Sequence, residues 1–192
     1  MPVLFVLLLF SSLCFGVTPV NAEKMSVSQA YKALHHQQTQ FKSSIAQMSA
    51  DESKYLDHLF FVTDLAFRER MVMLQAFRAG KDKKYIDKYN KEIANLLGSF
   101  SLIDPPTSNL KNVETHIISA IDEQREFFNM WHAARGTSQY SNLQKNFMSN
   151  KNVQSSHRKL LQAYSLLKKH YPKEGSHNQQ SFFDHLCALD FI

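Results

Sequence analysis

Glycine and cysteine are scarce in this chain. There are five glycines and two cysteines among 192 residues, and no stretch alternates apolar and polar residues as a half-buried strand does. Apolar residues recur instead every three or four positions, as they do on one face of a helix. The sequence therefore predicts an all-α fold. The low cysteine count excludes a small scaffold stapled by several disulfides.

Charge is missing from the first 22 residues. They contain no Asp, Glu, Lys or Arg, and their apolar run covers residues 3–17. This pattern predicts a secretory signal peptide over residues 1–22, because the run is shorter than the ~20 residues that span a membrane. A retained membrane anchor is the alternative. Residues 23–192 would form a single helical-bundle domain, periplasmic or secreted, with Cys187 as a buried structural thiol.

Four long segments carry the helical periodicity. They cover about residues 27–48, 50–98, 110–135 and 152–171. Gly80 interrupts the second segment and either kinks or breaks it; of the two, we expect one long helix that is kinked at Gly80. A shorter segment near the C-terminus is expected to cover one end of the assembly. The sequence thus predicts an antiparallel four-helix bundle with a short C-terminal helix, preceded by a signal peptide.

The most apolar stretch after the N-terminus runs from His58 to Phe77. Asp64 and Arg68 lie within it, and a charge at the centre of a membrane-spanning helix costs roughly 2.5 to 3.5 kcal/mol. A membrane span is therefore excluded. A helix that is apolar over so wide an arc is expected at the centre of a bundle, in contact with more than one neighbour.

Three polar residues interrupt the apolar faces of the predicted helices, namely Glu69, Gln124 and Gln38. Because buried polar groups need hydrogen-bond partners, we expect at least two of them to meet, Glu69 and Gln124 first. His58 shares its side of the helix with Glu69, so these four residues form a candidate buried polar cluster or ligand pocket. Two alternatives remain open: the cluster only fixes how the helices pair, or Glu69 pairs with Arg125.

Motifs of catalytic and metal sites are absent from the sequence. It has nine histidines but no His-Glu-x-x-His, no Cys-x-x-Cys-His and no Gly-x-Ser-x-Gly, which would indicate a zinc protease, a c-type haem and a serine hydrolase respectively. We therefore expect no enzymatic activity, no metal site and no cofactor. The alternative is a bundle that carries haem or a transition metal near His58, Glu69 and Gln124.

Basic residues gather in the C-terminal third. Residues 135–176 contain eight Lys or Arg and one acid, Glu174. Such a segment suits an acidic protein partner, an anionic membrane surface, or solubility alone. Nucleic acid is not expected, because an exported protein does not meet it and no aromatic–basic motif is present. The predicted partner face consists of Arg158, Lys159, Lys168 and Lys169.

Taken together, these patterns predict an exported helical-bundle binding or accessory protein without catalytic activity. The oligomeric state stays open.

Overall fold

The computed structural model describes residues 39–191. Every regular element in that range is a helix, and no strand occurs in it. This confirms the all-α fold class. The expected signal peptide at residues 1–22 and the candidate residue Gln38 lie outside the described residues.

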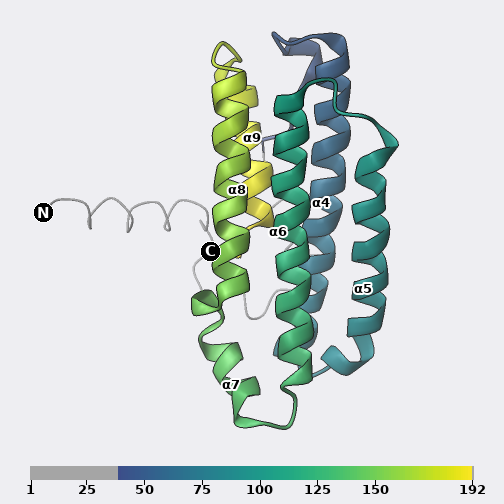
Figure 1. Ribbon diagram of the computed structural model, residues 1–192, viewed down its shortest axis with the longest axis vertical. Helices are drawn as coiled ribbons and strands as arrows, with labels where there is room; N and C mark the ends of the chain where they lie inside the picture. Colours follow the sequence, from purple (N-terminus) through teal and green to yellow (C-terminus); the bar gives the residue numbers. More distant parts are fainter. Residues whose placement is uncertain (1–38, 192) are drawn as a thin grey trace, which may run out of the picture.

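Within this range, six α-helices and three short 3-10 helices follow one another along the chain. They are η1 (Ser43–Ile45), α4 (Ala50–Arg78), α5 (Asp82–Ser99), η2 (Phe100–Leu102), α6 (Ser108–Ala133), α7 (Ser138–Lys145), η3 (Phe147–Ser149), α8 (Lys151–His170) and α9 (Ser176–Leu189). The long helices alternate in direction, and α7 lies at one end of the molecule (Figure 1). The most extensive contact joins α6 and α8; α4 contacts both α5 and α9.

Helix α4 begins where the sequence predicts it. The Ser49 side chain accepts a hydrogen bond from the backbone N–H of Glu52, and the Glu52 carboxylate accepts one from the backbone N–H of Ser49. This capping box satisfies two backbone donors that the first turn of a helix leaves without a partner. The start of α4 is therefore fixed by local sequence.

The predicted kink at Gly80 is wrong, because α4 ends there. Gly80 has φ +66°, and the backbone N–H of Lys81 donates to the carbonyl of Ala76 at 2.7 Å. This is the Schellman arrangement, in which a left-handed glycine closes the last helical turn. The chain then reverses, and α5 packs against α4 as a separate helix.

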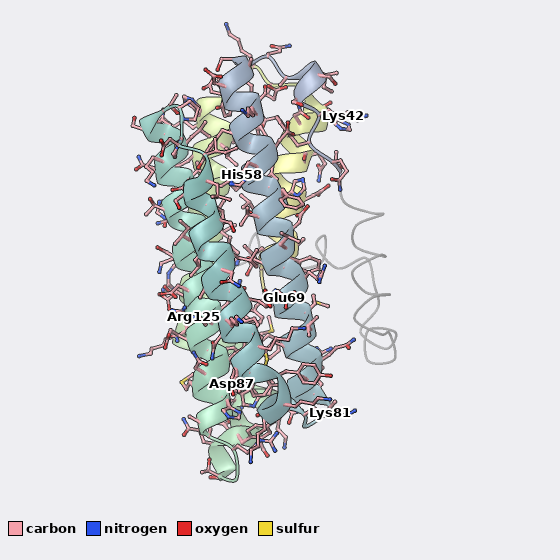
Figure 2. The ribbon with its side chains drawn as sticks, turned by 90° about the vertical axis from the view of Figure 1, so that its right-hand side faces the viewer. Lys42, His58, Glu69, Lys81, Asp87 and Arg125 are labelled. Carbon is pink, nitrogen blue, oxygen red and sulfur yellow. The ribbon has the colours of Figure 1, made fainter. Side chains whose placement is uncertain are left out.

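The prediction of a helix over residues 27–48 is also wrong for residues 39–48, the part of it that the structure describes. Residues 39–42 are not helical, and only the short η1 follows before α4. The backbone N–H groups of Thr39 and Lys42 donate to the side chains of Asp184 and Asn178 on α9, at 2.8 and 3.0 Å. These amides are therefore engaged by α9 instead of by a helical turn, and Figure 2 shows Lys42 beside that helix.

The C-terminal helix exists, but it does not cover one end of the assembly as expected. Helix α9 lies lengthwise against α4 and α8 (Figure 1). Its Phe182 is fully buried and its ring lies 5.8 Å from that of Phe60 on α4. The helix thus contributes side chains to the core, among them Phe182, Leu186 and Leu189. Its sequence of 14 residues with several polar positions did not predict this.

Aromatic side chains dominate the centre of the molecule. The Trp131 indole on α6 stacks on Phe77 of α4 at 4.2 Å, and Phe128 stacks on the same Phe77 at 5.5 Å. All three side chains are almost completely buried. Such rings each remove a large apolar area from water, which is the main favourable term in folding.

Two further expectations concern membrane-crossing helices and the state of Cys187. None of the described helices has the length and apolarity to cross a membrane. Cys187, expected as a thiol, is instead disulfide-bonded.

Candidate functional site

Gln124 is buried as the sequence predicts, with 1% of its surface exposed. Its side-chain amide donates to the Ser156 hydroxyl at 3.0 Å and to the backbone carbonyl of Leu189 at 2.8 Å. One residue of α6 thereby joins α8 and the end of α9. Gln124 therefore has the partners that a buried amide requires, and neither of them is Glu69 or Gln38.

Glu69 and His58 do not join Gln124 in a pocket. The Glu69 side chain is 16% exposed and lies 3.6 Å from the Arg68 guanidinium. His58 bonds through Nε2 to the carbonyl of Ser99 at 2.9 Å. It lies roughly 16 Å from Glu69 along α4, as eleven residues of helix require, and Figure 2 shows the two well separated. Arg125 pairs with Asp122 at 2.6 Å and has no ion pair with Glu69.

The buried charge of α4 is Arg70, the residue after Glu69. Only 5% of Arg70 is exposed. Its guanidinium donates to the Ala188 carbonyl at 2.7 Å and lies over the rings of Phe67 and Phe191, at 5.3 and 4.9 Å. Burial lowers the pKa of Arg70 to about 10, against the opposing attraction of Asp190. Arg70 therefore ties the C-terminal residues to the middle of α4.

Histidine–carboxylate pairs connect several helices. Each places a ring nitrogen 2.6 to 3.3 Å from a carboxylate oxygen, and the four pairs are His132–Asp82, His157–Asp190, His170–Glu52 and His185–Asp64. No hydrogen bond within residues 39–191 joins a histidine ring to a Ser, Thr or Cys side chain. The described residues thus show no hydrogen-bonded pair of a nucleophile and a histidine, and we interpret the histidine–carboxylate pairs as ties between helices.

The most elaborate of these ties surrounds Asp82 at the start of α5. Its carboxylate is completely buried and lies 2.7 Å from His132 Nδ1. It also accepts hydrogen bonds from the Arg135 guanidinium and, at 3.2 Å, from the Tyr140 hydroxyl. Arg135 donates in addition to the carbonyl of Gly80 at 3.0 Å. The α4–α5 turn is thereby locked onto the end of α6 and onto α7.

The described residues were predicted to hold no metal ion. Among them, no three His, Cys, Asp or Glu side chains are grouped closely enough to hold an ion. The residues named for the cofactor alternative, His58, Glu69 and Gln124, do not converge either. The fold therefore offers that alternative no support from these residues.

The predicted basic face is largely exposed. Helix α8 contains five Lys or Arg and no acid. Arg158, Lys168 and Lys169 are exposed, and no ion pair within residues 39–191 engages them. Lys159 differs, because it lies 2.8 Å from Glu123 of α6. Burial acts to raise the pKa of Glu123, but hydrogen bonds from Lys159 and Ser155 outweigh it and hold that pKa below its usual range.

A hollow adjoins the basic face at the α8–α9 turn. Its volume is about 400 Å³, and its lining includes Tyr164 and Lys168 of α8 with Ser176, Gln179 and Gln180 of α9. Lys168 belongs to both the face and the hollow. Three exposed cations and a concavity thus occur together on one side of the molecule, and we call Arg158, Lys168, Lys169 and this lining the basic α8 surface.

Some features of the site were not found from the sequence. The salt bridge of Lys159 depends on how α6 and α8 are aligned. No local sequence pattern predicts this alignment. Arg70 did carry a signal: its neighbours at helical spacing, Ala66, Phe67, Met73 and Leu74, are all apolar. The criterion that selected Glu69, a charged residue with apolar neighbours at helical spacing, therefore also selects Arg70.

Comparison with known proteins adds no further constraint: no protein-family model, curated protein or solved structure matches the chain.

Proposed function

We propose that this chain is an exported, non-enzymatic binding protein whose basic α8 surface holds an acidic segment of a partner protein. Four of its helices, α4, α6, α8 and α9, would form the bundle, and α5 would pack on its α4–α6 side. The single observation that carries the proposal is the composition and exposure of α8. This helix has five cations and no acid, and four of the cations, Lys151, Arg158, Lys168 and Lys169, are exposed without an ion pair within residues 39–191.

The arrangement of charge suits a narrow acidic partner. Arg158 and Lys169 are eleven residues apart on one helix, so their positions span roughly 16 Å along it. An extended or helical segment with several Asp or Glu could contact these cations in turn, and electrostatic complementarity of this kind favours association and selects partners. The hollow beside Lys168 would receive an acidic side chain.

An anionic membrane is the less favourable partner. Glu123 of α6 pairs with Lys159 of α8, and Glu126, one turn later on α6, is exposed. A broad anionic surface would approach these acids together with the lysines. The exposed face of α8 also offers little apolar surface to insert, since Leu161 is its one exposed large apolar residue. Stable membrane attachment usually combines charge with substantial apolar insertion.

The proposal is tested with a fluorescein-labelled peptide of eight glutamates, by fluorescence polarisation at low ionic strength. The double variant Lys168→Glu and Lys169→Glu is expected to bind at least tenfold more weakly than the unchanged protein, because attraction becomes repulsion at two positions. The matched control replaces Lys83 and Lys84 of α5, also adjacent and exposed, with glutamate and is expected to change binding less than threefold.

Two results would overturn the proposal. One is an equal loss of binding in both double variants, which would mean that only net charge matters. The other is tighter association with phosphatidylserine-containing vesicles than with the peptide, abolished by the α8 substitutions, which would make the surface a lipid site.

Export is a separate part of the proposal and rests on residues 1–22. In cells that express the chain with its own N-terminus, we expect the protein in the periplasm or the medium. An intact mass that begins at Glu23 would identify cleavage after Ala22, which would leave Cys187 as the one cysteine of the chain and so without an internal disulfide. The full 22.2 kDa mass would identify a retained leader. Recovery of the protein in the cytoplasm would contradict export.

A further inference from the structure

A second hollow lies between α4 and α9, where the chain enters the described fold near Phe41. Its volume is about 300 Å³, at the lower end of the range for small-molecule sites. Its lining combines aromatic rings with two carboxylates and contains no Lys or Arg. That composition is unusual in a chain whose formal net charge is +5.

The aromatic part of this hollow is ordered by ring packing. Phe60 of α4 lies parallel to the His185 ring at 4.6 Å, and Phe41 meets Phe60 edge-on at 5.7 Å. Phe61 is 62% exposed and also lines the hollow. Leaving an aromatic side chain in water forgoes its burial energy. A ligand that covers Phe61 would recover part of that energy.

The acidic part comes from one side of α4. Asp57 and Asp64 are seven residues apart, so they lie two helical turns apart on the same face. His185 Nδ1 lies 2.7 Å from the Asp64 carboxylate, which holds this acid in place. Asp57 is exposed and forms no ion pair within residues 39–191. The hollow thus presents one carboxylate held by a histidine and a second one at its edge.

We propose that this α4–α9 hollow binds a small organic cation, an ammonium group carried on an aromatic or branched apolar body. The ammonium group would lie beside the Asp57 carboxylate, which attracts it by charge. The face of the exposed Phe61 ring would also attract a cation. The apolar body would rest on Phe61, because Phe60 is only 2% exposed and is already packed against other rings. This site is independent of the basic α8 surface, since it lies on other residues and selects the opposite charge.

The first experiment titrates the full chain with 2-phenylethylammonium chloride by isothermal calorimetry. 2-Phenylethanol and 3-phenylpropionate serve as neutral and anionic comparators of similar size. The expected result is saturable binding of the ammonium compound, with affinity at least tenfold higher than for either comparator. Two results would overturn the proposal. One is the absence of saturation up to about 10 mM of the ammonium compound, and the other is equal binding of the anion.

Two matched carboxylate variants locate the site. Asp57→Asn is expected to weaken binding of 2-phenylethylammonium about tenfold, because the charged hydrogen-bond acceptor is lost. Asp87→Asn removes an exposed carboxylate from α5 (Figure 2) and should leave the affinity unchanged. Phe61→Ala should also weaken binding. Both acids are exposed, so both variants should keep the helical circular dichroism spectrum. Equal affinities of the two carboxylate variants would place the cation elsewhere and overturn the assignment.

Discussion

Replacing Asp82 with alanine is expected to lower the free energy of unfolding by about 3 kcal/mol. The Asp82 carboxylate is completely buried and is contacted by His132, Arg135 and Tyr140. Its removal leaves these donors facing a site that no longer accepts a hydrogen bond. The loss stays at the lower end of the range for broken buried pairs, since the side chains of Arg135 and His132 are 39% and 31% exposed and water can solvate them.

The control for this variant is Asp87→Ala on the same helix. Asp87 is exposed and labelled in Figure 2, so its replacement should change stability by no more than about 0.5 kcal/mol. Urea unfolding followed by circular dichroism measures both variants. If Asp82→Ala were as stable as Asp87→Ala, the Asp82 cluster would have no role in holding the α4–α5 turn to α6.

Arg70 gives a second large effect, and two substitutions separate its charge from its volume. Arg70→Ala should cost about 3 kcal/mol, because the side chain packs between Phe67 and Phe191 and a cavity would remain. Arg70→Met keeps an unbranched chain of similar length and removes a charge whose burial is unfavourable, as its lowered pKa of about 10 indicates. This variant should lie within about 1 kcal/mol of the unchanged protein, or be more stable.

The same urea experiment decides between the two contributions of Arg70. If the methionine variant lost as much stability as the alanine variant, the hydrogen bond to the Ala188 carbonyl and not packing would account for the effect. The interpretation of Arg70 as a mainly apolar contact would then be wrong.

Local sequence was sufficient for the parts of the fold that local contacts determine. The start of α4 follows from Ser49 and Glu52, and the end of α6 precedes Gly136, which has φ +82°. Gly80 shows the limit of this approach. A glycine within a periodic segment can bend a helix or end it, and only the contact of α5 with α4 distinguishes the two outcomes.

Contacts between distant segments explain the other errors. The apolar positions of residues 39–48 fit a helix, yet α9 binds this segment through Asp184 and Asn178, more than 130 residues away in sequence. Similarly, Glu69 and Arg70 both have apolar neighbours at helical spacing. Which of them is buried depends on where Ala188 and Phe191 pack, and the sequence of α4 contains no information on that.

The basic surface was predictable in its charge and not in its shape. Composition alone identified Arg158, Lys168 and Lys169, and the structure leaves all three exposed. The pairing of Lys159 with Glu123 and the hollow beside Lys168 require the alignment of α8 with α6 and α9. A helical periodicity gives the direction of each side chain but not its neighbours on other helices.

The most direct test of the basic α8 surface is to map the bound peptide on the protein. Titration of the ¹⁵N-labelled chain with the peptide of eight glutamates should shift the backbone amide signals of residues 158–169 and 176–180, and leave those of α5 in place. This result would locate the acidic segment on α8 and at its hollow. Shifts centred on Lys83, Lys84 and the other lysines of α5, or spread evenly over all exposed lysines, would contradict the account.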